Sequence, residues 1–458
     1  MTFTIRNVEI AERSGLDVRI EGGRIAAIAP NLPPDRENID GRGGALIPGL
    51  CDHHIHLFGL AARADSVTLD GVTTAQAFAA RIKAAAATRP EGAWIRVLGY
   101  HETIAGDLTR TDLDALAPRH RLRVQHQTGS LWVLNSAGLA ALGDSNGAPN
   151  VEPEPGRIWR GDVWLRERIG AETPPLAPTG KMLASYGITS VTDASVTTDE
   201  SAAAILADAV RSKTLPLRLT LMSGGELSAP EDGAVAVGPV KVLLDDHSLP
   251  PLDEFIARIR RAREWKRNVA VHCVTAGELA LTLAAFDAAG ARLGDRIEHG
   301  GVIPEAAIGE IKRLGLTVVT QPIFIRERGD RYAQHVAPAD LGDLYRCASL
   351  VAAGIPVAGG SDAPYASADP WQSIAAAIDR RGASGTPLGV SEALTPRAAL
   401  DLYLGKAASP GKTAKPLAAG DAADLCLLNA PLGQSLAEPD RRRVRGTWLD
   451  GSLTHAAL

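Results

Sequence analysis

The sequence predicts an α/β fold: a (β/α)8 barrel of the TIM type, with a small β-sandwich domain built from both chain termini and a large insertion after the first strand. Three observations predict it. Short β-branched runs alternate with helical patterns through the middle of the chain, both ends of the chain are typical of strands, and residues 57–187 separate the first barrel strand from the second. At roughly 150 residues per domain, the 458 residues allow about three domains.

The two ends of the chain carry alternating apolar runs separated by turn signals such as Gly22-Gly23 and Asp450-Gly451. These runs are Val8–Ile10, Asp17–Ile20, Arg24–Ile28, Ala423–Leu428 and Val444–Leu449. We expect residues 1–49 and 406–458 to form one composite β-sandwich domain. Two unrelated β extensions are the alternative.

The barrel is assigned to residues 50–405, and residues 57–187 are expected to form a lid or cap insertion at its mouth. Its predicted strands are Ala45–Ile47, Ile188–Thr192, Leu217–Leu221, Val240–Leu244, Val269–His272, Arg296–His299, Thr317–Thr320 and Pro356–Ala358. The helices predicted from apolar spacing near 3.6 are Asp199–Lys213, Asp253–Lys266, Ala276–Ala289, Pro304–Leu314 and Leu341–Ala353. Two further strands, Trp94–Leu98 and Arg123–Gln127, are predicted inside the insertion.

Composition and charge exclude several classes of protein. The net charge of −5 argues against a nucleic-acid binder or a polybasic membrane protein. No stretch approaches the roughly 18 to 20 apolar residues of a membrane span, and no secretory signal is visible. Four widely spaced cysteines form no disulfide framework, so we expect a cytoplasmic protein. Its expected partner is a small-molecule substrate, and the chain could form a homo-oligomer.

The sharpest motif is Asp52-His53-His54-Ile55-His56, at the end of an extended run. Since side chains alternate along a strand, His54 and His56 point to the same side, where two imidazoles can ligate one metal ion. Surface or hydrogen-bonded histidines are the alternative for this pair taken alone.

Three further residues follow predicted barrel strands. His272 and His299 end two of the strands, and Asp362 follows the last one. Barrel enzymes place their sites at the carboxyl ends of the strands, so this set predicts a metal site there.

Lys241 stands within an otherwise apolar strand, where a lysine is costly unless it is paired or chemically altered. One interpretation is carbamylation, which converts the amine into a carboxylate that bridges two metals. An ion pair with Asp245 or Asp246, or a side chain that leaves the barrel, is the alternative.

On these motifs the chain resembles the amidohydrolase superfamily, and within it the YtcJ-like branch of metal-dependent hydrolases. The resemblance runs through Asp52-x-His54-x-His56, Gly187-Ile188-Thr189-Ser190, Lys241, His272, Arg296-Ile297-Glu298-His299, Ser361-Asp362 and Gly420-Asp421-Ala422-Ala423-Asp424-Leu425. One departure is Thr128-Gly129-Ser130 before Trp132, where many YtcJ-like proteins carry Asp-Gly-His. Family substrates are therefore not carried over to this chain.

The resemblance implies one or two divalent ions, most often zinc. His54, His56 and Asp362 would hold the more buried ion. His272 and His299 would hold the second, and Lys241 would bridge the two.

The function expected from these ligands is hydrolysis of a non-peptide C–N bond, in an amide or cyclic amide of a small molecule, by metal-activated hydroxide. Asp362 would be the general base and proton shuttle, although it could serve as a ligand alone. In a one-metal version of the site, His299 would instead hydrogen-bond the attacking water or the developing oxyanion. The alternatives are a one-metal deaminase of a heterocyclic amine and a non-catalytic barrel scaffold.

Substrate contacts are expected from the insertion and the βα loops. The candidates are Tyr100, His101, Trp132, Arg157 and Arg326. Each also has a structural or surface interpretation. Cys273, beside His272, is predicted to be a buried thiol rather than a nucleophile.

Overall fold

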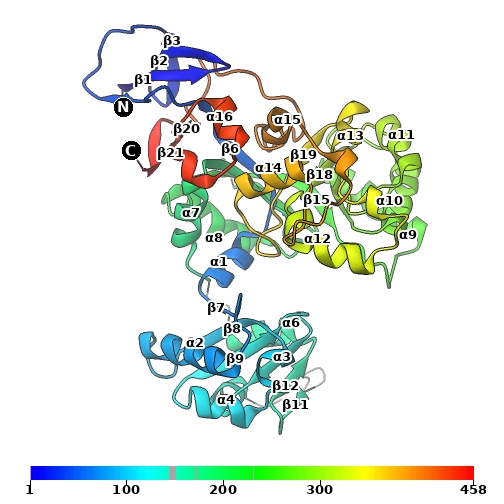
Figure 1. The fold of residues 1–458 in the computed structure, drawn as a ribbon. Coiled ribbons are helices and arrows are strands. Elements are labelled where there is room, and N and C mark those ends of the chain that lie inside the picture. The colour runs from blue at the N-terminus through cyan, green and yellow to red at the C-terminus, as the bar shows by residue number, and fades with distance from the viewer. Residues whose placement is uncertain (1, 144–150, 171–172, 231, 458) are drawn as a thin grey trace. The chain divides into compact units, whose positions relative to one another are not determined.

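The computed structural model describes residues 2–143, 151–170, 173–230 and 232–457. Figure 1 shows the fold, with helices and strands labelled where there is room. The chain divides into two compact units. The first unit comprises residues 1–57 and 179–458, and the second comprises residues 58–178.

An eight-stranded parallel sheet forms the centre of the first unit and confirms the predicted fold class. In order around the sheet, its strands are β6 (Leu50–Ile55), β13 (Ile188–Asp193), β14 (Arg218–Ser223), β15 (Val235–Val242), β16 (Val269–Cys273), β17 (Arg296–His299), β18 (Thr317–Thr320) and β19 (Val357–Gly359). The segment after β19 closes the barrel against β6: the Asp362 N–H donates to the His54 carbonyl at 2.7 Å, and the His56 N–H donates to the Ala363 carbonyl at 2.8 Å.

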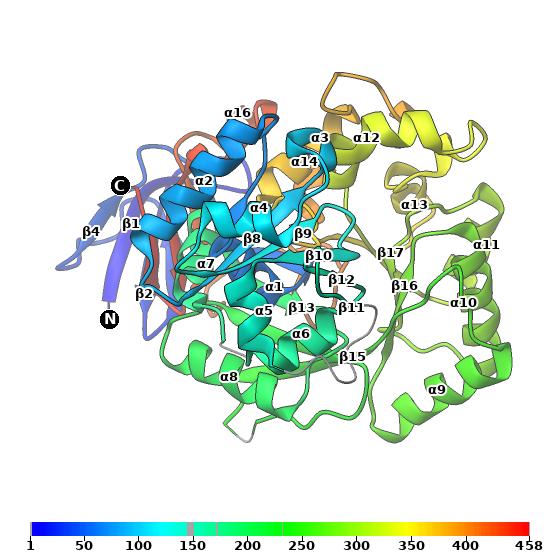
Figure 2. The same cartoon turned by 90° about the horizontal axis from the view of Figure 1, so that it is seen from below.

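Helices follow most barrel strands, and Figure 2 shows α9, α10 and α11 on the outside of β15, β16 and β17. The helices of this unit include α7 (Leu176–Ser185), α8 (Glu200–Arg211), α9 (Leu252–Glu264), α10 (Ala276–Ala289), α11 (Glu305–Arg313), α12 (Ile323–His335), α13 (Ala348–Ala352), α14 (Pro370–Asp379), α15 (Pro396–Asp401) and α16 (Leu432–Ala437). In α9, Phe255, Ile259 and Ala262 lie on one buried face, as the apolar spacing predicts. A capping box between Thr275 and Glu278 fixes the start of α10.

Two predicted elements are wrong. The run Ala45–Ile47 is not the first barrel strand: β5 (Leu46–Pro48) pairs antiparallel with β20 (Leu425–Leu428), and the barrel begins at β6. Both runs are buried, so hydrophobicity alone cannot tell which sheet each one joins. The predicted helix Leu341–Ala353 is instead a short 3-10 turn at Leu341–Asp343 followed by α13.

Strands from both chain ends form two four-stranded sheets with a common core. One sheet has the order β3 (Arg24–Ala29), β2 (Arg13–Glu21), β1 (Thr2–Ile10), β4 (Asn38–Asp40), and the other has the order β22 (Ser452–Ala456), β21 (Val444–Leu449), β20, β5. Phe3 of the first sheet stacks on Trp448 of the second, with ring centroids 6.4 Å apart. Gly22 and Gly23 have positive φ values of 56° and 80°, which suit glycine in the predicted turn.

The second unit is a six-stranded mixed sheet with helices on both faces. Its strand order is β11 (Val151–Glu152), β12 (Arg157–Trp159), β10 (Leu131–Leu134), β9 (Arg121–His126), β8 (Trp94–Tyr100), β7 (Val67–Thr68). One core packs the sheet against α2 (Ala75–Thr88) and α4 (Arg110–Leu116), and the other packs it against α5 (Ser136–Leu142) and α6 (Asp162–Ile169). Helix α1 (Leu57–Ala64) precedes the sheet, and the short α3 (Glu102–Ala105) follows β8. β8 and β9 confirm the two strands predicted in this region.

Across the described ranges, each helix is too short or too polar to serve as a membrane span.

Candidate metal centre

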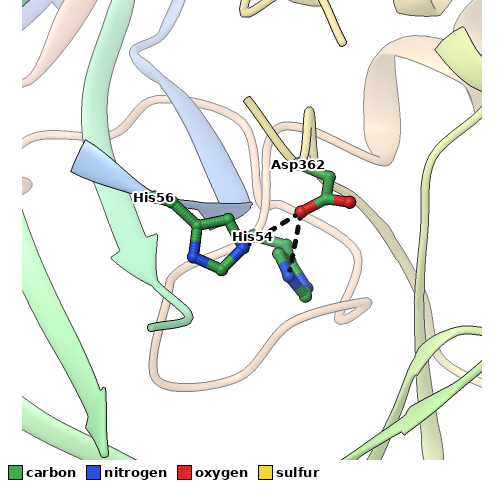
Figure 3. A group of neighbouring side chains, drawn as sticks. All are labelled: His54, His56 and Asp362. Atoms are coloured by element: carbon green, nitrogen blue, oxygen red, sulfur yellow. Dashed lines mark hydrogen bonds and ion pairs between the residues drawn. The ribbon is translucent and has the colours of Figure 1, made fainter. Parts of the chain in front are cut away.

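Three side chains converge where the barrel closes. Ligand atoms of His54, His56 and Asp362 all lie within 4.8 Å of one another. The Asp362 Oδ1 atom is 3.1 Å from His56 Nε2 and 3.4 Å from His54 Nε2. Figure 3 shows this carboxylate oxygen facing both imidazoles. Asp362 lies 306 positions after His56 in the sequence, so two distant segments supply one set of donors.

The backbone explains this convergence. His54 and His56 lie two residues apart at the end of β6, so both rings face the same side. Asp362 is held beside them by the main-chain bonds that close the barrel, in a left-handed conformation with φ of 55°. A Cβ on Gly360 would lie 2.6 Å from His54 Cβ, so only glycine allows this approach.

His272 and His299 extend the cluster from the neighbouring strands β16 and β17. Their ring centroids are 4.5 Å apart, and the His299 ring is 4.7 Å from that of His54. His299 also has a left-handed backbone, with φ of 71°. A non-glycine residue in this region costs of order 1–3 kcal/mol and occurs preferentially at functional sites.

Lys241 is 3% exposed, and its Nζ atom has no hydrogen-bond partner among the described residues. The alternative ion pair with Asp245 or Asp246 is not formed in the described structure. Asp245 accepts from the His247 main chain, and Asp246 accepts from the Thr275 hydroxyl. Burial lowers the pKa of Lys241, which raises the share of the uncharged amine, the form that reacts with carbon dioxide to give a carbamate.

Outer hydrogen bonds orient the imidazoles. Nδ1 of His54 bonds to Glu298, Nδ1 of His299 lies 2.8 Å from Gln321 Oε1, and Nδ1 of His56 lies 3.0 Å from Ser195 Oγ. A carboxylate or amide oxygen accepting from Nδ1–H leaves the Nε2 lone pair for a metal. These partners were not predicted, apart from the presence of Glu298 in the Arg296–His299 motif.

The electrostatics favour neutral imidazoles and an ionised carboxylate. Burial, as the largest cause, lowers the pKa of His272 to about 4 and that of His299 to about 3. Burial raises the pKa of Asp362, but the His56 hydrogen bond and the electrostatic interactions with His54, His299 and His56 outweigh that effect, so the net shift of the pKa is downward. Neutral imidazoles and a carboxylate are the donor set that zinc binds in proteins. We call His54, His56, Lys241, His272, His299 and Asp362 the barrel site.

Four of the candidate substrate residues make contacts within their own unit. The Tyr100 hydroxyl donates to the Gly106 carbonyl at 2.6 Å, inside a core of the second unit. Trp132 is buried in the other core of that unit, and Arg157 lies 3.4 Å from the Leu108 carbonyl. Arg326, on α12 of the first unit, pairs with Asp379 at 2.5 Å. Their substrate roles stay predictions, as does that of His101.

Cys273 has a structural environment. Its side chain is buried beside the Thr282 hydroxyl, and burial raises the pKa of the thiol to about 12. The thiol is therefore protonated at neutral pH, in agreement with the predicted buried thiol.

Comparisons with known proteins give a consistent result. The model of the amidohydrolase family matches residues 37–455. N-substituted formamide deformylase of Arthrobacter pascens is 24% identical and is aligned over 98% of this chain and 97% of its own. A protein named YtcJ from Bacillus subtilis (strain 168) is 25% identical, over 92% and 91% of the two chains.

A solved structure of a metal-dependent hydrolase from Pyrococcus furiosus, described as uncharacterized, matches the fold. Its TM-score is 0.74 at 21% identity, and the match covers 93% of this chain and 98% of the hydrolase.

Proposed function

This chain belongs to the amidohydrolase family and is an enzyme of that hydrolytic type. From that premise we propose that it cleaves a C–N bond other than a peptide bond, in an amide or cyclic amide of a small molecule, with the barrel site as its metal centre. The single observation that carries the proposal is the convergence of His54, His56 and Asp362 within 4.8 Å.

The residues of the barrel site fit one or two divalent ions, most simply zinc. His54, His56 and Asp362 would hold the first ion. His272 and His299 would hold a second, and Lys241, once carbamylated, would bridge them. The Lys241 Nζ atom has no hydrogen-bond partner among the described residues, which supports this assignment. When bound, zinc lowers the pKa of water from 15.7 toward about 7 and polarises a carbonyl group.

Asp362 would carry the proton. Its carboxylate is ionised and lies between two imidazoles, so it can accept the proton of the attacking water and pass it to the leaving nitrogen. Gln321 holds the His299 ring through Nδ1, so His299 keeps a fixed orientation beside Asp362.

The choice of substrates to assay first is guided by the relatives of this chain. A relative aligned over nearly the whole chain bears the name N-substituted formamide deformylase, which supports an acyclic amide as the first class to assay. The alternative function, deamination of a heterocyclic amine, would use the same donor residues. Its product, ammonia, would distinguish it from amide hydrolysis.

The test is an activity panel with metal counting. Purified protein would be assayed with N-substituted formamides, cyclic amides and aminated heterocycles, with amine, carboxylate and ammonia measured as products. We expect amine release from the amide series, and Asp362→Asn should lower turnover by at least about 100-fold while the protein still binds metal. Asp253→Asn, an exposed residue on α9, is the matched control.

Ammonia release from the heterocycles alone would favour the deaminase. Unchanged activity in Asp362→Asn would contradict the proton-shuttle role. No activity on any member of a broad panel, with metal-free protein as isolated, would favour the scaffold alternative.

A further inference from the structure

The second unit contains another group of metal-ligating side chains, separate from the barrel site. His101, Glu102 and His126 place one nitrogen or oxygen atom each within 4.8 Å of the others. His126 Nε2 is 3.0 Å from Glu102 Oε2, and His101 Nε2 is 3.6 Å from Glu102 Oε1. We propose that these three residues form a second divalent-cation site, with zinc as the ion of matching chemistry.

The sheet explains why the two histidines meet. β8 and β9 are parallel neighbours, and Tyr100, the last residue of β8, pairs with His126, the last residue of β9. His101 follows directly, so both imidazoles stand at the carboxyl ends of adjacent strands. Their rings stack with centroids 5.7 Å apart and an interplanar angle of 29°.

Each histidine begins the same short motif, His-x-Thr. The Thr103 hydroxyl is 2.9 Å from His101 Nδ1, and the Thr128 hydroxyl is 2.8 Å from His126 Nδ1. A hydroxyl can accept the Nδ1 proton, which leaves the Nε2 lone pair for a cation. The two Nε2 atoms are the ones that face Glu102.

The donor set defines the ion. Two imidazoles and one carboxylate are a zinc-type set with a fourth position left for solvent or another ligand. Hard cations such as magnesium and calcium prefer all-oxygen sites, so they fit less well. The cluster is accessible for ion exchange, since the Glu102 side chain is 53% exposed.

A hydrogen-bonded clasp without metal is the competing interpretation. The main-chain N–H groups of Thr103 and Thr128 donate to the Nδ1 atoms of His101 and His126 at 3.2 and 3.3 Å. Each Nε2 then carries the ring proton, which His126 donates to Glu102 at 3.0 Å and His101 directs toward Glu102 at 3.6 Å, so the site is complete without an ion. Cation binding moves one proton per ring from Nε2 to Nδ1, where the threonine hydroxyls accept it. The two interpretations therefore differ in metal content.

The experiment compares metal equivalents in the full-length protein. Chelator-treated protein would be titrated with Zn²⁺ at pH 7.5 against a competing indicator, and with Co²⁺ by absorbance. Wild type should bind one equivalent more than the double variant H101Q/H126Q. His335→Gln, an exposed histidine on α12, is the matched control and should keep the full number.

Two further variants keep the result decisive. The barrel variant H54Q/H56Q should retain the additional equivalent, which separates this site from the proposed catalytic one. Glu102→Gln, at an exposed position, should lower the affinity of the additional equivalent by at least about 10-fold. Equal equivalents in wild type and H101Q/H126Q, or unchanged affinity in Glu102→Gln, would overturn the proposal in favour of the clasp.

Discussion

Glu298→Gln offers a sharp test of how the barrel site is held. Glu298 is fully buried on β17, where one carboxylate oxygen accepts from Arg296 Nε and the other bonds to His54 Nδ1. Both neighbours need an acceptor if His54 is to present Nε2 to a metal. A glutamine has only one carbonyl oxygen, so either way round its NH2 group faces one of the two donors.

The magnitude follows from this conflict. A buried hydrogen bond to a charged group contributes about 1.5–3 kcal/mol, so Glu298→Gln should lower the free energy of unfolding by about that amount. If the amide oxygen stays with Arg296, His54 loses its orienting partner. Loss of such an outer partner typically lowers metal affinity by about 10–100-fold.

The assay pairs this variant with Glu392→Gln. Glu392 is also buried in the first unit and also accepts from an arginine, Arg346 at 2.7 Å, but it bonds to none of the barrel-site residues in the described structure. Urea unfolding of metal-free protein should show a loss in both variants. Zinc affinity should fall in Glu298→Gln alone. The reasoning is refuted if Glu298→Gln binds zinc as tightly as wild type, or if both variants lose affinity equally.

Three other outcomes follow from the structure. Gly360→Ala should lower the metal content of the protein, and it should lower the free energy of unfolding by about 1–3 kcal/mol, because the new Cβ would collide with His54. Gly309→Ala, in open space on α11, is the control and should raise the free energy of unfolding by about 0.5–1 kcal/mol. Urea unfolding measures both changes. Lys241→Met should raise the unfolding free energy of metal-free protein at pH 7 by about 1–3 kcal/mol, since it removes a buried amine that has no partner in the described part of the chain. An unchanged urea midpoint would contradict this. Burial raises the pKa of Asp369, the N-cap of α14. The folded protein therefore keeps this carboxyl protonated to a higher pH than the unfolded chain does. The free energy of unfolding should fall as the pH rises from about 4 through the raised pKa. Asp369→Asn keeps a side-chain oxygen for the N-cap and should remove this decrease in the free energy of unfolding, measured by urea titrations at several pH values. If the variant and the wild type show the same pH dependence of the free energy of unfolding, Asp369 is not its cause.

The sequence predicts the barrel and its ligand candidates because both depend on local patterns. Strands β17 and β18 have the predicted bounds, and α10 begins and ends where its apolar period does. His54, His272 and His299 come together as expected because parallel strands bring their carboxyl ends to one edge. The error at Ala45–Ile47 arises because a buried strand has the same pattern whichever sheet it joins.

The outer partners of the barrel site could not be predicted in this way. Glu298 and His54 are 244 positions apart, and Gln321 lies 22 positions after His299, directly after the next strand. No periodicity connects such pairs, since their contact depends on strand order, side-chain direction and the exact closure of the barrel. The left-handed backbones of His299 and Asp362 are likewise set by tertiary contacts rather than by residue type.

The cluster in the second unit shows which piece of information was missing. His101 directly follows one strand that the sequence does predict, His126 lies at the end of another, and each begins a His-x-Thr motif. The rule that locates the barrel site, histidines at the carboxyl ends of adjacent parallel strands, would also have brought these two together. Applying it requires knowing that β8 and β9 are parallel neighbours, whereas β9 and β10 form an antiparallel pair. In the barrel the βα repeat supplies that knowledge, and in the irregular second unit only the structure does.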